Sequence, residues 1–155
     1  MNLSLQKITA PLLTEKISQY LLKAAYYFIA LVLISSGVIK IIDAGSLITV
    51  LTSAFPFVNE NIQIAIASLL PLIEMLTGIL LLLKIKKKEA MLAAVILFSA
   101  FTLFAVYGFI FGIEEDCGCF GNVVESSFGW GMIVRNLIFA LIAFLILIQA
   151  KREIV

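Results

Sequence analysis

Histidine is absent from this 155-residue sequence, and only 14% of the residues carry a charged side chain. The chain therefore lacks the side chain that most often acts as a general base near neutral pH, and it lacks a common zinc ligand. A soluble domain has about a quarter charged residues, so the low charge content indicates a chain that dissolves poorly in water. The net charge of +1 gives no long-range field that would attract nucleic acid.

Long apolar segments take the place of charge, and apolar residues make up 63% of the chain. Four segments of 22 to 24 residues contain few charges: residues 21–42, 62–83, 90–113 and 129–150. As helices at about 1.5 Å per residue they would measure roughly 33–36 Å, enough to cross a hydrocarbon core of about 30 Å. The third has no charged residue, whereas a helix on the surface of a soluble protein shows a polar face. The sequence therefore predicts an all-α integral membrane protein, a four-helix transmembrane bundle that spans the lipid bilayer.

Basic residues indicate the orientation of this bundle, because they gather in three regions that four crossings place on one side. These residues are Lys7, Lys16, Lys23, Lys84, Lys86, Lys87, Lys88, Lys151 and Arg152. Basic loops stay on the cytoplasmic side, so we expect both termini in the cytoplasm of a bacterial cell. The predicted organisation is a cytoplasmic lead (1–20), a multi-pass domain in the inner membrane (21–150) and a cytoplasmic tail (151–155). A cleaved signal peptide in place of the first span would leave three spans and loops at odds with their charges.

Two shorter features flank the spans. In the lead, Pro11 is expected to break the chain, with an interfacial helix starting near Thr14. On the opposite side, residues 43–61 are apolar enough to form a short helix at the membrane interface. Within the spans, Ser36, Gly37, Ser68 and Gly78 are small enough to let neighbouring helices approach closely.

The only two cysteines, Cys117 and Cys119, lie one residue apart between the third and fourth spans, on the expected periplasmic side. The Cα atoms of residues i and i+2 in a turn can fall within the roughly 4.4–6.8 Å that a disulfide accepts, and Gly118 allows such a tight turn. A ring this small adds little stability, and strained disulfides are labile, so a Cys117–Cys119 disulfide suits exchange. Three acidic residues at 114–116 disfavour a thiolate at Cys117, so Cys119 is expected to be the more acidic thiol.

Two alternatives for the cysteines stay open. They could form a passive disulfide or be ordinary loop thiols. They could also bind a metal, but two thiolates without histidine would need further ligands, so no metal site is predicted.

Charged residues inside the spans form a second group of candidates. Glu74 and Arg135 lie in the second and fourth spans, and a charge at such depth is unfavourable by several kcal/mol unless it is paired. Their depths differ by roughly 10 Å at about 1.5 Å per residue, so the two side chains would only partly bridge the gap. Lys40 is nearer the end of its span and is expected to extend to the interface. The group could be an internal ion pair that fixes packing or a ligand or proton site, with Asn136 and Tyr107 as hydrogen-bonding neighbours.

Four segments in this order resemble the MauE family of methylamine-utilisation proteins, within the broader DoxX-like group. They are Ser36-Gly37-Val38-Ile39-Lys40, Pro71-Leu72-Ile73-Glu74-Met75-Leu76-Thr77-Gly78, Cys117-Gly118-Cys119-Phe120-Gly121 and Val134-Arg135-Asn136. The resemblance covers almost the whole chain, from Tyr26 to Gln149. It implies a four-helix membrane bundle that works with redox partners.

The resemblance also implies roles for particular residues. Cys117 and Cys119 would exchange with a periplasmic thioredoxin-fold partner during maturation of an enzyme such as methylamine dehydrogenase. Lys40, Glu74 and Arg135 would build a polar interior. Gly118, Phe120, Gly121 and Asn136 would support the motifs. A quinone is the possible cofactor that relatives suggest, although membrane disulfide generators relay electrons to quinone through two cysteine pairs and this chain has one.

Three functions therefore remain open. The first is a component of a thiol–disulfide oxidoreductase system, favoured by the cysteine pair. The second is a non-catalytic assembly or anchoring subunit, favoured by the short loops. The third is a carrier of a small molecule or proton that uses Glu74 and Arg135.

Overall fold

The computed structural model describes the backbone of residues 3–112 and 130–152, and the side chains of residues 19–112 and 130–149. All regular structure in these ranges is helical. The helices are α1 (Leu3–Ile42), α2 (Ala44–Ala54), α3 (Glu60–Leu82), α4 (Lys87–Ile110) and α5 (Trp130–Arg152). Four helical segments are long and apolar enough to cross a membrane: Gln19–Ile42, Glu60–Leu82, Lys87–Ile110 and Trp130–Gln149. The predicted all-α fold with four membrane spans is therefore confirmed.

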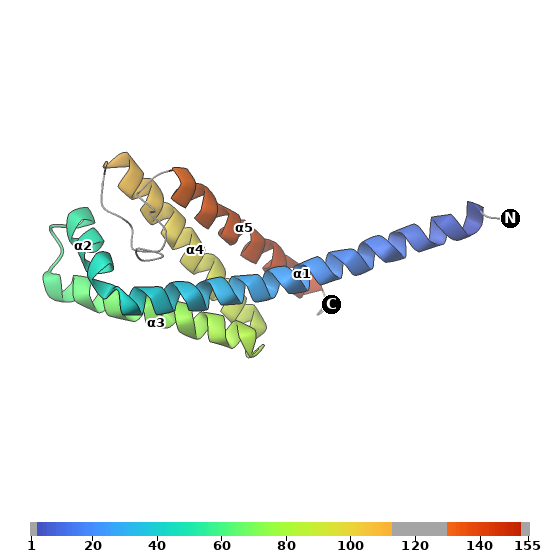
Figure 1. The fold of residues 1–155 in the computed structure, drawn as a ribbon, viewed down its shortest axis with the longest axis horizontal. Helices are drawn as coiled ribbons and strands as arrows, with labels where there is room; N and C mark the ends of the chain where they lie inside the picture. Colours follow the sequence, from blue (N-terminus) through green and yellow to red (C-terminus); the bar gives the residue numbers. More distant parts are fainter. Residues whose placement is uncertain (1–2, 113–129, 153–155) are drawn as a thin grey trace.

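The four spans pack as two pairs, with α1 against α3 and α4 against α5, and contacts of α3 with α4 and of α1 with α5 join the pairs (Figure 1). Helix α2 lies at one end of the bundle, which we call the α2 end. The lysine turn, which we define as residues 84–88, joins α3 to α4 at the opposite end and includes the first two residues of α4. The N-terminal part of α1 extends beyond the other helices (Figure 1).

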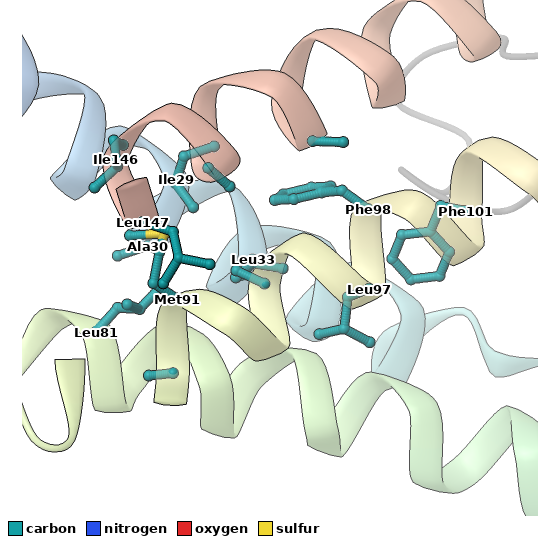
Figure 2. Close-up of a cluster of buried hydrophobic side chains, with 14 residues drawn as sticks. Ile29, Ala30, Leu33, Leu81, Met91, Leu97, Phe98, Phe101, Ile146 and Leu147 are labelled. Carbon is teal, nitrogen blue, oxygen red and sulfur yellow. The ribbon is translucent and has the colours of Figure 1, made fainter. Parts of the chain in front are cut away.

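The core lies between the two pairs and is almost entirely apolar. Ile29 and Leu33 of α1 face Leu81 of α3, Met91 of α4 and Leu147 of α5 (Figure 2). About 33% of each span is buried inside the bundle, and many large apolar side chains face outwards. Because such exposed apolar surface is unfavourable in water, its extent on all four spans suits contact with lipid.

Two glycines set the spacing between α1 and α3. A Cβ atom on Gly37 would lie 2.7 Å from the carbonyl oxygen of Pro71, and one on Gly78 would lie 2.8 Å from that of Ala30. Real side chains do not approach backbone this closely, so the helix backbones are in contact where these glycines lie. The close contact predicted for these glycines is confirmed, whereas Ser68, for which close contact was also expected, is exposed. Gly37 comes after Ala30 along α1, but its contact Pro71 comes before Gly78 along α3, which shows that the two helices are antiparallel.

The helix before the first span differs from the sequence prediction. α1 begins at Leu3 and continues through Pro11 to Ile42, so the expected break at Pro11 is wrong. The proline removes one hydrogen bond, the one that its missing N–H would donate, and the rest of the helix ladder continues on both sides. The short helix expected within residues 43–61 is present as α2.

The α2 end is held together by buried polar contacts. The amide nitrogen of Gln63 donates to the carbonyl oxygens of Phe55 (2.9 Å) and Val58 (3.1 Å), and its amide oxygen accepts from Thr52 Oγ1 (2.8 Å). The Tyr107 hydroxyl of α4 donates to the Ala54 carbonyl oxygen at 3.1 Å, so Tyr107 does make a hydrogen bond, but its partner is the backbone of α2 and not the charged group beside which it was expected. These contacts join α2, α3 and α4.

Candidate functional site

A buried ion pair joins α1 to α3. Lys40 Nζ donates to Glu74 Oε1 at 2.6 Å, and the two side chains are 1% and 0% exposed. Ser36 completes a triangle: its hydroxyl donates to Glu74 Oε2 at 2.7 Å and accepts from Lys40 Nζ at 3.1 Å. Both carboxylate oxygens and the ammonium group therefore have charged or polar partners inside the bundle.

The direction of helix side chains explains why this pair forms. Side chains on a helix lean towards the N-terminus of their own helix. Because α1 and α3 are antiparallel, Lys40 near the end of α1 leans down into the bundle, and Glu74 in the middle of α3 leans up towards it. The expectation that Lys40 extends to the membrane interface is therefore wrong. Its lean points the ammonium group over Ser36, one helical turn earlier, instead of past the end of the helix.

An aromatic ring provides a further contact for the lysine. Lys40 Nζ lies 4.2 Å from the ring centroid of Phe101 on α4, within the range in which a ring face attracts a cation. Such contacts are worth about 2 kcal/mol when they are desolvated. Three helices thus surround the ammonium group: α1 with Ser36, α3 with Glu74 and α4 with Phe101.

The structure gives Glu74 a charged partner other than the one considered with it in the sequence. Glu74 makes its ion pair with Lys40 instead of Arg135. Arg135 lies near the start of α5, where its side chain is half-buried. The next residue, Asn136, is 5% exposed and points to the region of the ion pair, since it lines a cavity together with Lys40.

This cavity lies between α1, α4 and α5. Its polar lining consists of Ser36, Lys40 and Asn136, and its apolar lining consists of Val32, Leu33, Phe98, Phe101 and Phe139. The volume open to the centre of a water-sized molecule is about 10 Å³, which is roughly the space for one water. A quinone ring is much larger, so this cavity does not fit one. Asn136 Nδ2 is buried and makes no hydrogen bond to the residues that the structure describes.

Two residues that contact Lys40, Ser36 and Phe101, are not predicted from the sequence to belong to this site. The sequence indicates Ser36 only as a small residue that allows close helix contact, although its spacing of four from Lys40 places it on the same helix face. Phe101 gave no signal, because one more phenylalanine in an apolar span does not indicate which ring meets a cation. Sequence reasoning did select the other members, Lys40, Glu74 and Asn136.

A comparison of this chain with models of protein families gives a match. A family model described as "Methylamine utilisation protein MauE" matches residues 18–149, which includes all four spans and the buried ion pair. The chain belongs to the MauE family. No curated protein and no solved structure matches it. Membership of the MauE family suggests involvement in methylamine utilisation.

The cysteine motif of this MauE-family chain, Cys117 to Gly121, lies outside the described residues, including Gly118 and Phe120. The structure does describe the residues that flank this motif, at the end of α4 and the start of α5. The rings of Phe109 and Trp130 are 5.4 Å apart at their centroids, so the end of α4 and the start of α5 are neighbours. Because Tyr107 contacts Ala54, these two helix ends lie at the α2 end of the bundle, opposite the lysine turn.

Proposed function

We propose that this MauE-family protein is the membrane component of a thiol–disulfide exchange system. In this proposal Cys117 and Cys119 exchange with a thioredoxin-fold partner in the periplasm, during maturation of an enzyme such as methylamine dehydrogenase. The observation that carries the proposal is the position of the only two cysteines, one residue apart between two membrane spans, in a chain whose family is linked to methylamine utilisation.

The exchange needs no cofactor beyond the two dithiols. A thiolate of the reduced partner attacks one sulfur of the Cys117–Cys119 disulfide, forming a mixed disulfide and releasing the other cysteine as a thiolate. The second thiol of the partner loses its proton and attacks the partner's own sulfur in the mixed disulfide. The products are a reduced cysteine pair here and a disulfide in the partner. Two electrons move to this chain, and the reverse sequence moves them to the partner.

Charge supports the proposed location of the cysteines outside the cytoplasm. The lysine turn is at one end of the bundle, and the helix ends that flank the cysteine motif are at the other. Basic residues are retained on the cytoplasmic side of membrane proteins, so a cytoplasmic lysine turn would direct the α2 end to the periplasm. An oxidising compartment permits disulfides to form and persist.

The buried ion pair has a supporting role in this proposal. Glu74 is held by Lys40 and Ser36, and Lys40 is held by Glu74, Ser36 and Phe101. A carboxylate with this set of contacts suits a fixed link between α1 and α3 better than a site that releases a transported ion. The geometry therefore favours the exchange function over the carrier function.

Trapping of the mixed disulfide tests the proposal. Cys117→Ser and Cys119→Ser variants would be expressed in intact cells, and the cells would be quenched with acid before electrophoresis without reductant. We expect one of the single variants to accumulate a covalent adduct with a partner protein, because the remaining cysteine lacks its resolving thiol. Reductant should dissolve the adduct.

A matched control shows whether the adduct depends on the motif. Ser53 is exposed on α2, so Ser53→Cys in a Cys117→Ser/Cys119→Ser background places a lone thiol at the same end of the bundle. This control should form no adduct of that size. If neither single variant forms an adduct that the control lacks, the exchange function is wrong.

A further inference from the structure

Hydrogen-bond donors from two helices meet at the cavity between α1, α4 and α5. Lys40 and Ser36 come from α1, and Asn136 comes from α5. An ammonium group carries three N–H donors. Two of the three on Lys40 are directed to Glu74 Oε1 and Ser36 Oγ, and the third has no oxygen acceptor among the described residues, although the Phe101 ring also lies near the ammonium group.

The amide of Asn136 adds donors to the same space. Its Nδ2 atom carries two N–H groups, is buried and makes no hydrogen bond to the described residues. A buried donor without an acceptor is unfavourable by about 1–3 kcal/mol. The cavity that Asn136 shares with Lys40 is therefore short of an acceptor, not of a donor.

Size and charge define what can supply that acceptor. The room of about 10 Å³ admits roughly one water molecule. A small cation such as methylammonium brings only donors and would lie beside the ammonium group of Lys40. An anion would gain little, because Glu74 already neutralises Lys40 at 2.6 Å. A neutral acceptor the size of water fits both conditions.

We propose that this cavity is a binding site for a single water molecule that bridges Lys40 and Asn136. The water accepts hydrogen bonds from Lys40 Nζ and Asn136 Nδ2. Ser36 Oγ, which accepts a hydrogen bond from Lys40 Nζ, lines the same cavity.

The bridge has a consequence for the whole bundle, because it connects the two helix pairs through polar groups. Without it, the polar contacts of the ion pair join α1 to α3 only, apart from the ring of Phe101. With it, a chain of hydrogen bonds runs from Glu74 of α3 through Lys40 of α1 and the water to Asn136 of α5. This site is independent of the cysteines and goes beyond the exchange function.

Water contact at the Asn136 amide can be measured directly. The protein would be labelled with ¹⁵N at asparagine side chains in lipid nanodiscs, and the signal that disappears in Asn136→Gln assigns the Asn136 amide. We expect a cross-relaxation peak between this amide and water, with the sign of a water that tumbles with the protein. The exposed amide of Asn59 should show only the sign of fast surface water. Absence of the bound-water peak in the unmutated protein overturns the proposal.

A double variant tests the part played by Lys40. Lys40→Met/Glu74→Met removes both charges together, so neither is left unpaired. Without the ammonium group the cavity loses most of its polarity, and apolar cavities of this size stay dry. We expect the Asn136–water peak to be lost. The matched control, Lys23→Met/Glu60→Met, makes the same changes at exposed positions and should keep the peak. A peak retained in Lys40→Met/Glu74→Met would show that Lys40 does not hold the water.

Discussion

Among single residues, Lys40 shows how position on a helix and direction of a side chain act together. A lysine close to the end of a membrane span commonly extends to the interface with its charged group. Lys40 does the opposite, because the N-terminal lean of helix side chains points it into the bundle, where Glu74, Ser36 and Phe101 surround its charge. The result is a charged contact that depends on two helices being correctly aligned.

The ion pair leads to a prediction about stability. Removing one partner leaves the other charge buried without compensation, so Lys40→Met or Glu74→Met should each lower the free energy of unfolding by about 3–5 kcal/mol. Lys40→Met/Glu74→Met should recover much of this loss, since no unpaired charge remains. Thermal unfolding in detergent would measure the three variants. The exposed Lys23→Met is the control, and a single variant as stable as this control would contradict the prediction.

Among the helices, close packing of α1 and α3 depends on the absence of side chains at two positions. Gly37 and Gly78 bring each backbone against the other, and this contact sets the register in which Lys40 meets Glu74. The packing at the two glycines and the ion pair are therefore coupled. A shift of one helix along the other that relieved the close backbone contact would lengthen the distance between Lys40 and Glu74.

Alanine substitutions test this contact. Gly37→Ala and Gly78→Ala should each be destabilising by about 1–3 kcal/mol, because the added Cβ atom meets a backbone oxygen that cannot move alone. Gly45→Ala on α2 is the matched control: a Cβ atom there meets nothing within 4 Å, and alanine favours helix by roughly 0.5–1 kcal/mol. Melting temperatures would compare the three. Equal effects at Gly37 and Gly45 would show that the helices are not in close contact.

Helix α2 depends on Gln63 for its attachment to α3. Gln63→Leu would leave the Phe55 and Val58 carbonyl oxygens without their hydrogen bonds from Gln63. This should lower the free energy of local unfolding at the α2 end by about 1–3 kcal/mol. Hydrogen exchange measured by mass spectrometry should show faster exchange in α2, while the exposed Gln19→Leu should leave it unchanged. Unaltered exchange in α2 of Gln63→Leu would show that other contacts hold this helix.

For the whole chain, the arrangement of the spans determines which loops share a side of the membrane. The lysine turn lies at one end, and α2 lies at the other together with the helix ends beside the cysteine motif. This arrangement makes the proposed periplasmic location of the cysteines dependent on one property, the side on which the lysines are retained.

Labelling in intact cells tests that orientation. In a cysteine-free background, Ser53→Cys on α2 should react with a thiol reagent that cannot cross the membrane, and Lys86→Cys in the lysine turn should react only after the membrane is opened. Both positions are exposed, so access differs only by the side they face. Reduced Cys117 and Cys119 of the unmutated protein should behave like Ser53→Cys. Labelling of Lys86→Cys from outside would show that the orientation is the reverse of the one proposed, and it would contradict the proposed function.

Much of the architecture was predictable because it depends on local composition. The four spans follow from the length of apolar segments, and the short helix α2 follows from the apolar stretch between two of them. The selection of Lys40, Glu74 and Asn136 as notable followed from the rarity of polar groups in such segments. The helix through Pro11 was mispredicted, because one missing hydrogen bond does not end a helix whose neighbours keep theirs.

Hydrophobicity along the chain was enough to establish a four-span membrane protein, because crossing a bilayer requires a run of apolar residues that can be counted. It could not establish that Lys40 binds Glu74 instead of reaching the interface, that Phe101 faces the ammonium group, or that Asn136 closes the same cavity. These contacts join residues more than thirty positions apart. They depend on which helices are neighbours, on their antiparallel register and on the lean of each side chain, and these exist only once the helices have packed.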